Sequence, residues 1–383
     1  MIKAVSIDDL RRRASKRIPR MIFDFLDGGA GNESGLRRNR EALDDLRFIP
    51  RALVDVDTID TQCRFLGRQW AMPFGVAPIG MSGMVWPGAE IAMARAAAFA
   101  NIPYTLSTAG TTSLERLKEA SPDNAWFQLY YARDPAVADD LVARADNAGY
   151  DVLMVTVDVP RPARRLRDIT NNFGLPFRPS LRLALDVASR PQWSLATLRN
   201  GMPRLETIAP YAPKGSGAQS LAAHMSSQST GRLDWEHLKR LRDRWPRHLI
   251  AKGIMSPEDA ERAKAIGLDA IAISNHGGRQ LEGCIATIEA LPAIRAATGP
   301  DYPIVFDGGV RSGEHIAKAL AAGASFVLAG RAFLYGIAAH GPENANVTID
   351  LLQEELMATM AQLGAPTLAD IRPEHLFKNA SAL

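Results

Sequence analysis

The chain has 383 residues, of which 46% are hydrophobic and 23% charged, so it can bury a large core and lacks the composition of a disordered protein. Its 45 basic and 42 acidic residues give a net charge of +3, too close to balance to indicate a nucleic-acid-binding protein. The two cysteines, Cys63 and Cys284, form no metal or disulfide pattern and are compatible with a reducing compartment. We therefore expect a soluble, cytoplasmic globular protein with no metal site and no nucleic acid as partner.

The N-terminal segment predicts a charged amphipathic helix. Its six basic residues between positions 11 and 20 are flanked by Asp8, Asp9 and Asp24, and no apolar signal-sequence core follows them. The two most apolar windows, 74–100 and 319–339, are interrupted by charged residues and glycines, so neither is expected to span a bilayer.

Apolar runs recur from residue 74 to residue 335, and an amphipathic or alanine-rich segment follows each of them. This alternation of strands and helices predicts a (β/α)8 barrel, an α/β fold whose catalytic residues lie on the loops after the strands. Ser113, Ser256 and Ser312 stand where helix N-caps are expected. The eight predicted strands are 74–80, 103–108, 125–130, 151–158, 248–253, 270–274, 303–309 and 326–330.

The connection after the fourth strand is unusually long. Roughly 70 residues separate Asp158 from a helix predicted near Leu233, whereas such loops usually have about two to six residues. We expect a single domain over residues 1–383. Its predicted parts are an N-terminal helical cap at about 1–70, the barrel at about 71–340, an insertion at about 177–230 and C-terminal helices at about 341–383.

Polar side chains gather where the predicted strands end, and the most informative of them are His276 and Arg279, in the glycine-rich segment 274–281. A histidine there can act as a base, and an arginine three residues later can bind a carboxylate. Lys252 ends a buried strand, which is costly without a negative partner. Further polar residues at strand ends are Ser107, Gln128, Tyr130, Thr156, Asp158 and Asp307.

Two glycine- and arginine-containing segments follow the last two strands, Asp307 to Arg311 and Leu328 to Arg331. In (β/α)8 barrels this is the usual phosphate site, because glycine permits close backbone approach and arginine matches phosphate geometry. Neither a Walker loop nor a G-x-G-x-x-G fingerprint is evident, which disfavours nucleoside triphosphates and a Rossmann dinucleotide.

Four motifs together resemble the FMN-dependent L-2-hydroxyacid dehydrogenases and oxidases. They are Thr156-Val157-Asp158, Lys252-Gly253, the octapeptide at 274–281, and Asp307-Gly308-Gly309-Val310-Arg311. The resemblance runs from Ser6 to about Leu376, and weaker matches at 190–195, 200–203 and 235–246 resemble the (S)-mandelate dehydrogenase branch most.

This resemblance implies that an L-2-hydroxy acid is oxidised to the 2-keto acid with FMN as the electron sink, and it implies a role for each motif residue. His276 would be the base and Asp158 would orient it, Arg279 and Arg165 would bind the substrate carboxylate, Tyr130 would bind the hydroxyl, and Lys252 would stabilise the reduced flavin. FMN-binding roles are implied for Pro78, Ile79, Gly80, Ser107, Gln128, Thr156, Ser274, Asp307, Gly309, Arg311, Gly330 and Arg331. Alternatively, Gln128 and Thr156 could be buried polar groups bonded to backbone, and Arg165 a surface arginine.

Four residues bear on the substrate and the electron acceptor. Phe25 stands where many members of this family carry a tyrosine that binds the substrate carboxylate, and such a hydrogen bond contributes on the order of 1.5–3 kcal/mol. Phe25 cannot make this hydrogen bond, and Ala109 and Gly110 leave space beside it. Together they predict that the substrate is a bulky, mandelate-like acid. Gly80, where the oxidases tend to carry alanine, predicts electron transfer to a quinone or another non-oxygen acceptor. L-lactate dehydrogenase and oxygen-using oxidase activities are the alternatives.

The insertion has the character of an interfacial segment. Between residues 177 and 214 it has six basic and two acidic residues, a net charge of +4, together with several leucines and Trp193. It predicts peripheral docking on the inner face of the membrane, near respiratory quinones. A lid over the active site or a subunit contact is the alternative. The resemblance also implies a homo-oligomer, namely a tetramer.

Other functions fit less well. The flavin-dependent isopentenyl diphosphate isomerases and the IMP dehydrogenase type share the barrel and the phosphate motif but have no use for His276 and Arg279. Cys284, within a segment expected to be helical, is poorly placed as an IMP dehydrogenase nucleophile. A non-catalytic flavin-binding protein is the remaining alternative.

Overall fold

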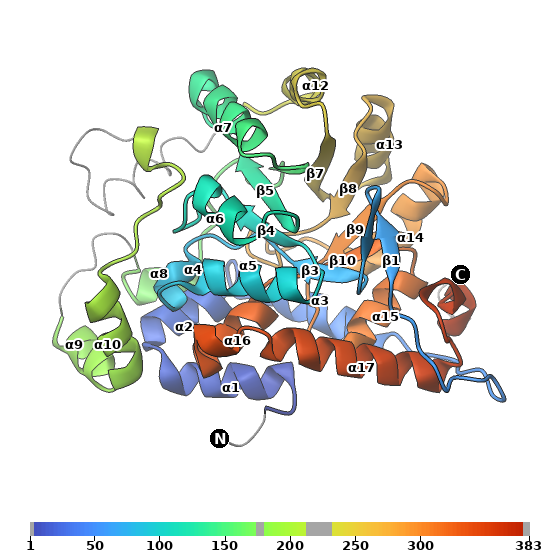
Figure 1. The fold of residues 1–383 in the computed structure, drawn as a ribbon, viewed down its shortest axis with the longest axis horizontal. Helices are drawn as coiled ribbons and strands as arrows, with labels where there is room; N and C mark the ends of the chain where they lie inside the picture. Colours follow the sequence, from blue (N-terminus) through green and yellow to red (C-terminus); the bar gives the residue numbers. More distant parts are fainter. Residues whose placement is uncertain (1–3, 174–179, 212–231, 378–383) are drawn as a thin grey trace.

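The computed structural model describes residues 4–173, 180–211 and 232–377. Eight parallel strands close into a barrel in the order β10-β3-β4-β5-β6-β7-β8-β9, with helices packed around it, so the predicted (β/α)8 fold is confirmed (Figure 1). Most ladders end before the predicted strand end, because the following residues turn away into the loops above the barrel. The strands are β3 (Phe74–Val76), β4 (Tyr104–Ser107), β5 (Ala125–Tyr130), β6 (Val152–Thr156), β7 (His248–Ile254), β8 (Ala270–Ile273), β9 (Ile304–Asp307) and β10 (Phe326–Ala329).

Helices follow the strands, and the three predicted serine caps are confirmed. The hydroxyls of Ser113, Ser256 and Ser312 each accept a hydrogen bond from the backbone N–H three residues later, which satisfies one free donor of the helix. The helices are α4 (Ser82–Val85), α5 (Ala89–Phe99), α6 (Leu114–Ala120), α7 (Pro135–Asn147), α12 (Trp235–Arg244), α13 (Pro257–Ala265), α14 (Thr287–Thr298), α15 (Gly313–Ala321) and α16 (Arg331–His340).

An antiparallel hairpin that the sequence analysis missed closes the amino-terminal end of the barrel. Strands β1 (Cys63–Phe65) and β2 (Arg68–Trp70) are joined by Leu66 and Gly67, both with positive φ, as a two-residue hairpin turn requires. Phe65 stacks on Phe326 at 4.9 Å between ring centroids, and Trp70 contacts Trp126 edge-on. These rings fill the bottom of the barrel, so the site must lie at its other end.

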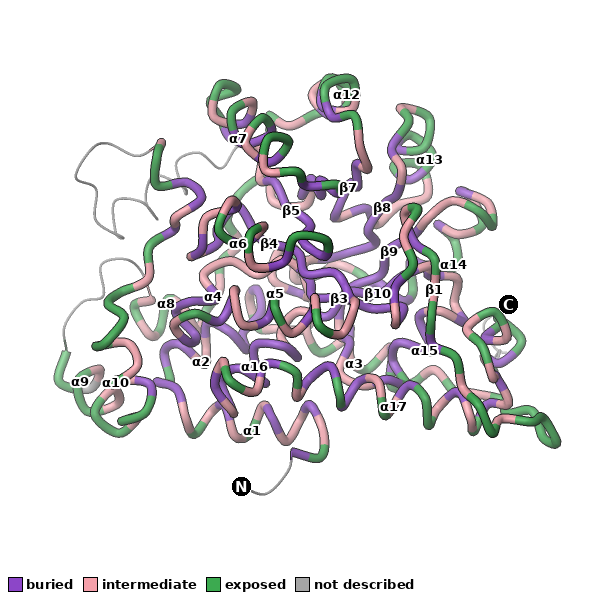
Figure 2. Tube along the Cα trace, in the orientation of Figure 1, coloured by how far each residue is buried: buried purple, intermediate pink, exposed green. Residues whose placement is uncertain are grey.

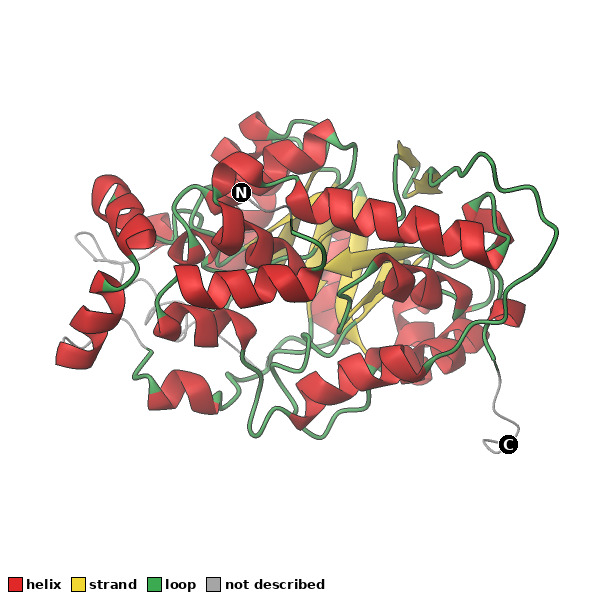
Figure 3. Ribbon diagram, turned by 90° about the horizontal axis from the view of Figure 1, so that it is seen from below, coloured by secondary structure: helices red, strands yellow, loops and turns green. Residues whose placement is uncertain are grey.

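The remaining helices cover the barrel from outside, and the buried residues concentrate at its strands (Figure 2). The predicted amphipathic N-terminal helix is α1 (Ile7–Arg17), which buries Ile7, Leu10 and Ala14 and packs along α16. The helix α17 (Val347–Leu363) packs on α15, and the view from below shows helices surrounding the strands of the barrel (Figure 3). The other cap and C-terminal elements are α2 (Arg20–Asp27), α3 (Ser34–Asp45), η2 (Pro342–Asn344), α17 (Val347–Leu363), η3 (Leu368–Asp370) and η4 (Pro373–His375).

The long connection after β6 divides into parts with different positions. After the short helix α8 (Leu166–Thr170), helices α9 (Leu181–Ala188) and α10 (Pro191–Asn200) pack on each other at the edge of the molecule (Figure 1). The segment around η1 (Ala209–Tyr211) instead bonds to Arg144 of α7 and to Thr112 before α6. Arg178 and Lys214, counted in the basic charge of the insertion, lie outside the described residues. No described helix is both long and apolar enough to cross a bilayer.

Two expectations from the sequence are corrected here. Trp193, expected on the membrane-facing surface, is only 8% exposed, and its indole N–H donates to the carbonyls of Met84 and Val85 at 3.3 and 3.1 Å. It therefore anchors α10 to α4. Cys284, expected within a helix, lies in the turn before α14, because Gly283 beside it interrupts the helical pattern.

Gly253, near the end of β7, has a backbone conformation and a close neighbour that only glycine tolerates. Its φ is +115°, and an added Cβ would lie 2.5 Å from the Cβ of Asp158. We expect Gly253→Ala to lower the free energy of unfolding by about 2 kcal/mol or more, since backbone strain and overcrowding add. Gly283→Ala, with open space around the new methyl group, is the matched control. Equal denaturant midpoints for the two variants would contradict the prediction.

Candidate active site

A cavity of about 420 Å³ lies at the carboxyl ends of the barrel strands. One side is lined by polar residues that follow β5 to β10, and the other side by apolar residues from α7 and the insertion. Most predicted site residues meet here. Those that line the cavity are Phe25, Pro78, Ile79, Gly80, Ala109, Tyr130, Thr156, Arg165, Lys252, His276, Arg279, Asp307, Gly309, Arg311, Gly330 and Arg331.

His276 is held between a carboxylate and a phenol. Its Nδ1 lies 3.2 Å from Oδ1 of Asp158, and its Nε2 lies 3.4 Å from the hydroxyl of Tyr130. Burial lowers the pKa of His276, and Asp158 offsets this only in part, so the imidazole is neutral at pH 7. Burial and the negative charge of Asp158 raise the pKa of Tyr130 to about 12, which keeps its proton on the phenol.

The backbone contributes to this arrangement. His276 adopts a left-handed conformation with φ +58°, and its N–H donates to the hydroxyl of Ser274. Burial alone would raise the pKa of Asp158, but His276 and Lys252 outweigh it and lower the pKa, so the group is a carboxylate. Its second oxygen, Oδ2, is buried without a hydrogen-bond partner.

Lys252 has the negative partner that its burial demands. Its ammonium group lies 2.9 Å from Oδ2 of Asp307 and donates to the hydroxyl of Ser274 at 2.7 Å. Burial would lower the pKa of Lys252, but Asp307 and Asp158 raise it above its ordinary value. A fixed positive charge therefore lies at the base of the cavity.

Arg279 and Arg165 approach the cavity from two different elements. Nη1 of Arg279 donates to the carbonyls of Phe25 and Gly28 at 2.9 and 2.6 Å, and its guanidinium lies 5.3 Å from the centre of the Phe25 ring. Burial, then Arg165 and Arg331, lower the pKa of Arg279. Arg165 is the N-cap residue of α8, and its Nε is buried without a partner. Two cations with free donors thus converge where an anion can bind.

The predicted phosphate loops lie together, although their arginines differ. Nε of Arg311 is buried without a partner, and Gly309 has φ +84° where a Cβ would meet the carbonyl of Asn39 at 2.5 Å. Arg331 instead donates to the carbonyls of Leu26, Gly277 and Gly28. Its side chain therefore ties α2 to the His276 loop, and burial lowers its pKa to about 10.

Ser107 and Gln128 form a hydrogen-bonded chain that reaches the cavity at Thr156. The hydroxyl of Ser107 donates to Oε1 of Gln128, whose amide donates to the hydroxyl of Thr156, each at 2.9 Å. Gln128 and Thr156 are thus bonded to side chains, unlike the alternative of backbone partners. Gly110 lies behind Ala109 and does not line the cavity. Leu106 and the carbonyl of Ser107 occupy the space beside its Cα, so Gly110 leaves no room for a substrate.

The apolar side of the cavity was missed by the sequence analysis. Val137 and Leu141 have the i, i+4 spacing of one helix face, which indicates burial but not the neighbour. The other residues belong to the insertion or to neighbouring loops, and only the tertiary fold brings them here. They are Met81, Tyr131, Ala132, Val159, Leu205, Ile208, Tyr211 and Leu233.

Comparisons with known proteins agree with this geometry. Residues 14–378 match the model of the FMN-dependent dehydrogenases. The chain is 40% identical to (S)-mandelate dehydrogenase of Pseudomonas putida over 97% of its length and 93% of that protein. It is 39% identical to L-lactate dehydrogenase of Caulobacter vibrioides over 96% of each chain.

The solved structures extend the likeness to the fold. The crystal structure of the monotopic membrane protein (S)-mandelate dehydrogenase superimposes with a TM-score of 0.94, covering 98% of this chain and 99% of that one. A mandelate oxidase structure that is 36% identical superimposes with a TM-score of 0.83, covering 97% and 98%. The chain belongs to the FMN-dependent dehydrogenase family.

Proposed function

We propose that the protein oxidises an L-2-hydroxy acid with a large apolar side chain to the 2-keto acid and passes the electrons to a quinone. The observation that carries this proposal is the neutral His276 between Asp158 and Tyr130, beside two arginines that face the same cavity. A hydroxy acid needs a base for its hydroxyl proton and a cationic site for its carboxylate, and this cavity supplies both.

Each residue has a role that follows from its geometry. Nε2 of His276 takes the hydroxyl proton, and Asp158 on Nδ1 stabilises the imidazolium that forms. Tyr130 donates to the substrate hydroxyl oxygen, while Arg279 and Arg165 hold the carboxylate. These groups orient the hydroxyl-bearing carbon toward the carboxyl ends of the barrel strands.

The residues present fit FMN. Arg311, with its unsatisfied buried Nε, and the loops at Gly309 and Gly330 would hold the phosphate, where the first turn of α16 also begins. Asp307 would bind the ribityl chain, while Pro78, Ile79, Gly80 and the Ser107–Gln128–Thr156 chain would hold the ring. FMN, when bound, accepts the two electrons removed from the substrate. Lys252 supplies a positive charge that favours the reduced cofactor.

The apolar side of the cavity supports a bulky substrate. Phe25 offers a ring instead of a hydroxyl, stacks on Phe173 at 4.5 Å, and faces a cavity wall of leucine, isoleucine and valine. L-Lactate is the second candidate, since lactate dehydrogenases share 39% identity with this chain.

A quinone acceptor and a peripheral membrane site belong to the same proposal. Leu181, Leu185 and Leu198 on α9 and α10 are 78%, 62% and 82% exposed, and the relative with a TM-score of 0.94 is a monotopic membrane protein. Such leucines insert into the interface while the basic residues approach anionic headgroups. The proposed location is the cytoplasmic face of a membrane. A homo-oligomer remains a prediction, checked by light scattering.

The substrate panel tests the proposed function directly. Under anaerobic conditions, L-mandelate and other bulky L-2-hydroxy acids should bleach the yellow flavin, and kcat/KM for L-mandelate should exceed that for glycolate by about tenfold or more. Dye or quinone should support faster turnover than oxygen. A flavin that no hydroxy acid bleaches would exclude the activity, and a tenfold preference for glycolate would exclude the substrate class.

The base assignment predicts a pH profile. Because only neutral His276 accepts a proton and burial lowers its pKa, kcat/KM should be constant above pH 6.5 and fall only at lower pH. Asp158→Asn should move this acidic limb to still lower pH, since Asp158 raises the pKa of His276.

Replacing the base tests its assignment directly. His276→Gln should reduce turnover by about 10²- to 10⁴-fold with FMN still bound. The control is His248→Gln at the opposite end of the barrel; equal losses would contradict the assignment.

Membrane docking predicts sedimentation with vesicles. The protein should pellet with phosphatidylglycerol vesicles at low salt and be released as salt rises, because screening weakens the attraction of surface charges. Replacing Leu181, Leu185 and Leu198 by serine should reduce pelleting. The control replaces Leu53 and Phe99, which are even more exposed and lie outside α9 and α10, by serine. Unchanged pelleting of the triple variant, or equal loss in the control, would exclude docking through α9 and α10.

A further inference from the structure

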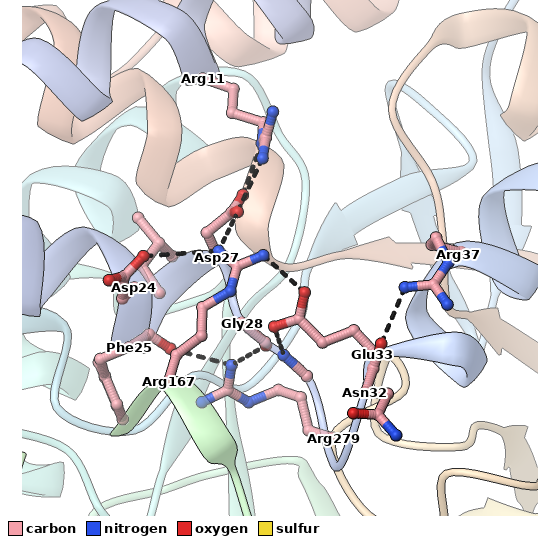
Figure 4. Close-up of polar contacts among 12 residues, drawn as sticks. Arg11, Asp24, Phe25, Asp27, Gly28, Asn32, Glu33, Arg37, Arg167 and Arg279 are labelled. Carbon is pink, nitrogen blue, oxygen red and sulfur yellow. Dashed lines mark hydrogen bonds and ion pairs between the residues drawn. The ribbon is translucent and has the colours of Figure 1, made fainter. Parts of the chain in front are cut away.

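The end of helix α2 carries a carboxylate on which three elements converge. Asp27, the last residue of α2, is only 4% exposed. Its oxygens accept a bidentate pair of hydrogen bonds from Arg11 of α1 at 2.5 and 2.8 Å, one from Arg167 of α8 at 2.9 Å, and one from Tyr335 of α16 at 2.7 Å (Figure 4 shows the arginines). None of these four side chains is used in the chemistry proposed above.

The same helix end orients one arginine of the carboxylate site. The carbonyls of Phe25 and Gly28, on either side of Asp27, both accept from Nη1 of Arg279 (Figure 4). Carbonyl groups at a helix C-terminus carry partial negative charge, so they hold one edge of the guanidinium and leave its other donors for a ligand. The position of Arg279 thus depends on the position of the α2 terminus.

The other arginine of the carboxylate site depends on Asp27 through Arg167. Arg165 is the N-cap of α8, a five-residue helix with no buried residue, so apolar packing does not fix where α8 lies. Polar contacts do this instead: Arg167 bonds to Asp27 and, at 2.5 Å, to Glu33, while Asn171 donates to Asp24 at 2.8 Å. The N–H of Gly31 also donates to the carbonyl of Arg164.

The charges in this network are strongly coupled. Burial alone would raise the pKa of Asp27, but the hydrogen bonds from Arg11, Tyr335 and Arg167 lower it far below its ordinary value. Asp27 and Glu33 likewise outweigh burial and raise the pKa of Arg167. The ion pairs are therefore intact throughout the pH range in which a flavoenzyme works.

We propose that Arg167 is a positioning residue: by bonding to Asp27 at the end of α2, where the neighbouring carbonyls hold Arg279, it sets the spacing between Arg165 and Arg279. This inference rests on the proposed function, because it assumes that the two arginines bind the carboxylate of a 2-hydroxy acid. Loss of Arg167 would release α8 and weaken carboxylate binding while leaving His276, Asp158 and Tyr130 in place.

A comparison of an acid with its amide tests the proposal. The ligands are phenylglyoxylate and phenylglyoxylamide, titrated into the oxidised FMN-bound protein and followed by the visible flavin spectrum. Misplacing a binding group by about 1 Å can cost up to about a hundredfold, so Arg167→Ala should weaken acid binding by about tenfold or more. The amide has no carboxylate, so its Kd should change by less than about twofold. KM for L-mandelate should rise more than kcat falls, and Arg167→Lys should recover part of the loss.

Arg11→Ala is the matched control, since Arg11 bonds to the same carboxylate but comes from α1, which carries no residue of the site. It should lower the melting temperature while keeping the acid-to-amide ratio near that of the wild type. Equal weakening of acid and amide in Arg167→Ala, or an equal change of the ratio in Arg11→Ala, would overturn the positioning role. A wild-type protein that binds no 2-oxo acid would instead overturn the proposed function, and the inference with it.

Discussion

Buried charge at one end of the barrel is the constraint on which the rest of the structure depends. Lys252 and four arginines, Arg165, Arg279, Arg311 and Arg331, line one cavity, whereas Asp307 is the only acidic residue among the described lining residues, with Asp158 close behind. An uncompensated buried cation is costly, so each must find carbonyls, carboxylates or a bound anion. The N-terminal cap supplies several of these groups: the carbonyls of Phe25, Leu26 and Gly28 take up donors of Arg279 and Arg331. The cap is in this sense part of the site, and the donors that it leaves free suit an anionic cofactor and substrate.

The barrel separates these polar groups from its apolar interior. Phe65 and Trp70 of the hairpin pack against Trp126 and Phe326 at the amino-terminal end. The polar residues of the site lie at the other end, where the strands lead into the loops. This placement lowers the pKa of His276 while Asp158 and Lys252 keep their charges, so that one group acts as a base and the others as fixed charges.

The long connection after β6 contributes both to the outer surface of the molecule and to the wall of the cavity. Trp193 anchors α10 to α4, and Arg17 reaches from α1 to Gln192, which leaves the leucines of α9 and α10 outward. Further along the chain, Leu205, Ile208 and Tyr211 line the cavity. The membrane and lid alternatives considered for the insertion thus concern different parts of it. An apolar wall beside the catalytic residues and an apolar surface at the molecular edge both suit a bulky substrate and a lipid-soluble acceptor.

The fold, the family and the candidate base could be predicted from the sequence, because each is indicated by a local pattern of residues. Strand periodicity and serine caps determined the barrel, and short motifs such as the octapeptide at 274–281 determined the family and the candidate base, His276. Other features arise from contacts between residues far apart in the chain, which no local pattern records. The tertiary structure alone decided that Trp193 is buried, that Arg331 binds carbonyls of the cap, that Gly110 lies behind the cavity wall, and that Asp27 joins α1, α8 and α16. Residue types indicate which groups can pair, but only the folded chain determines which of them are close enough to do so.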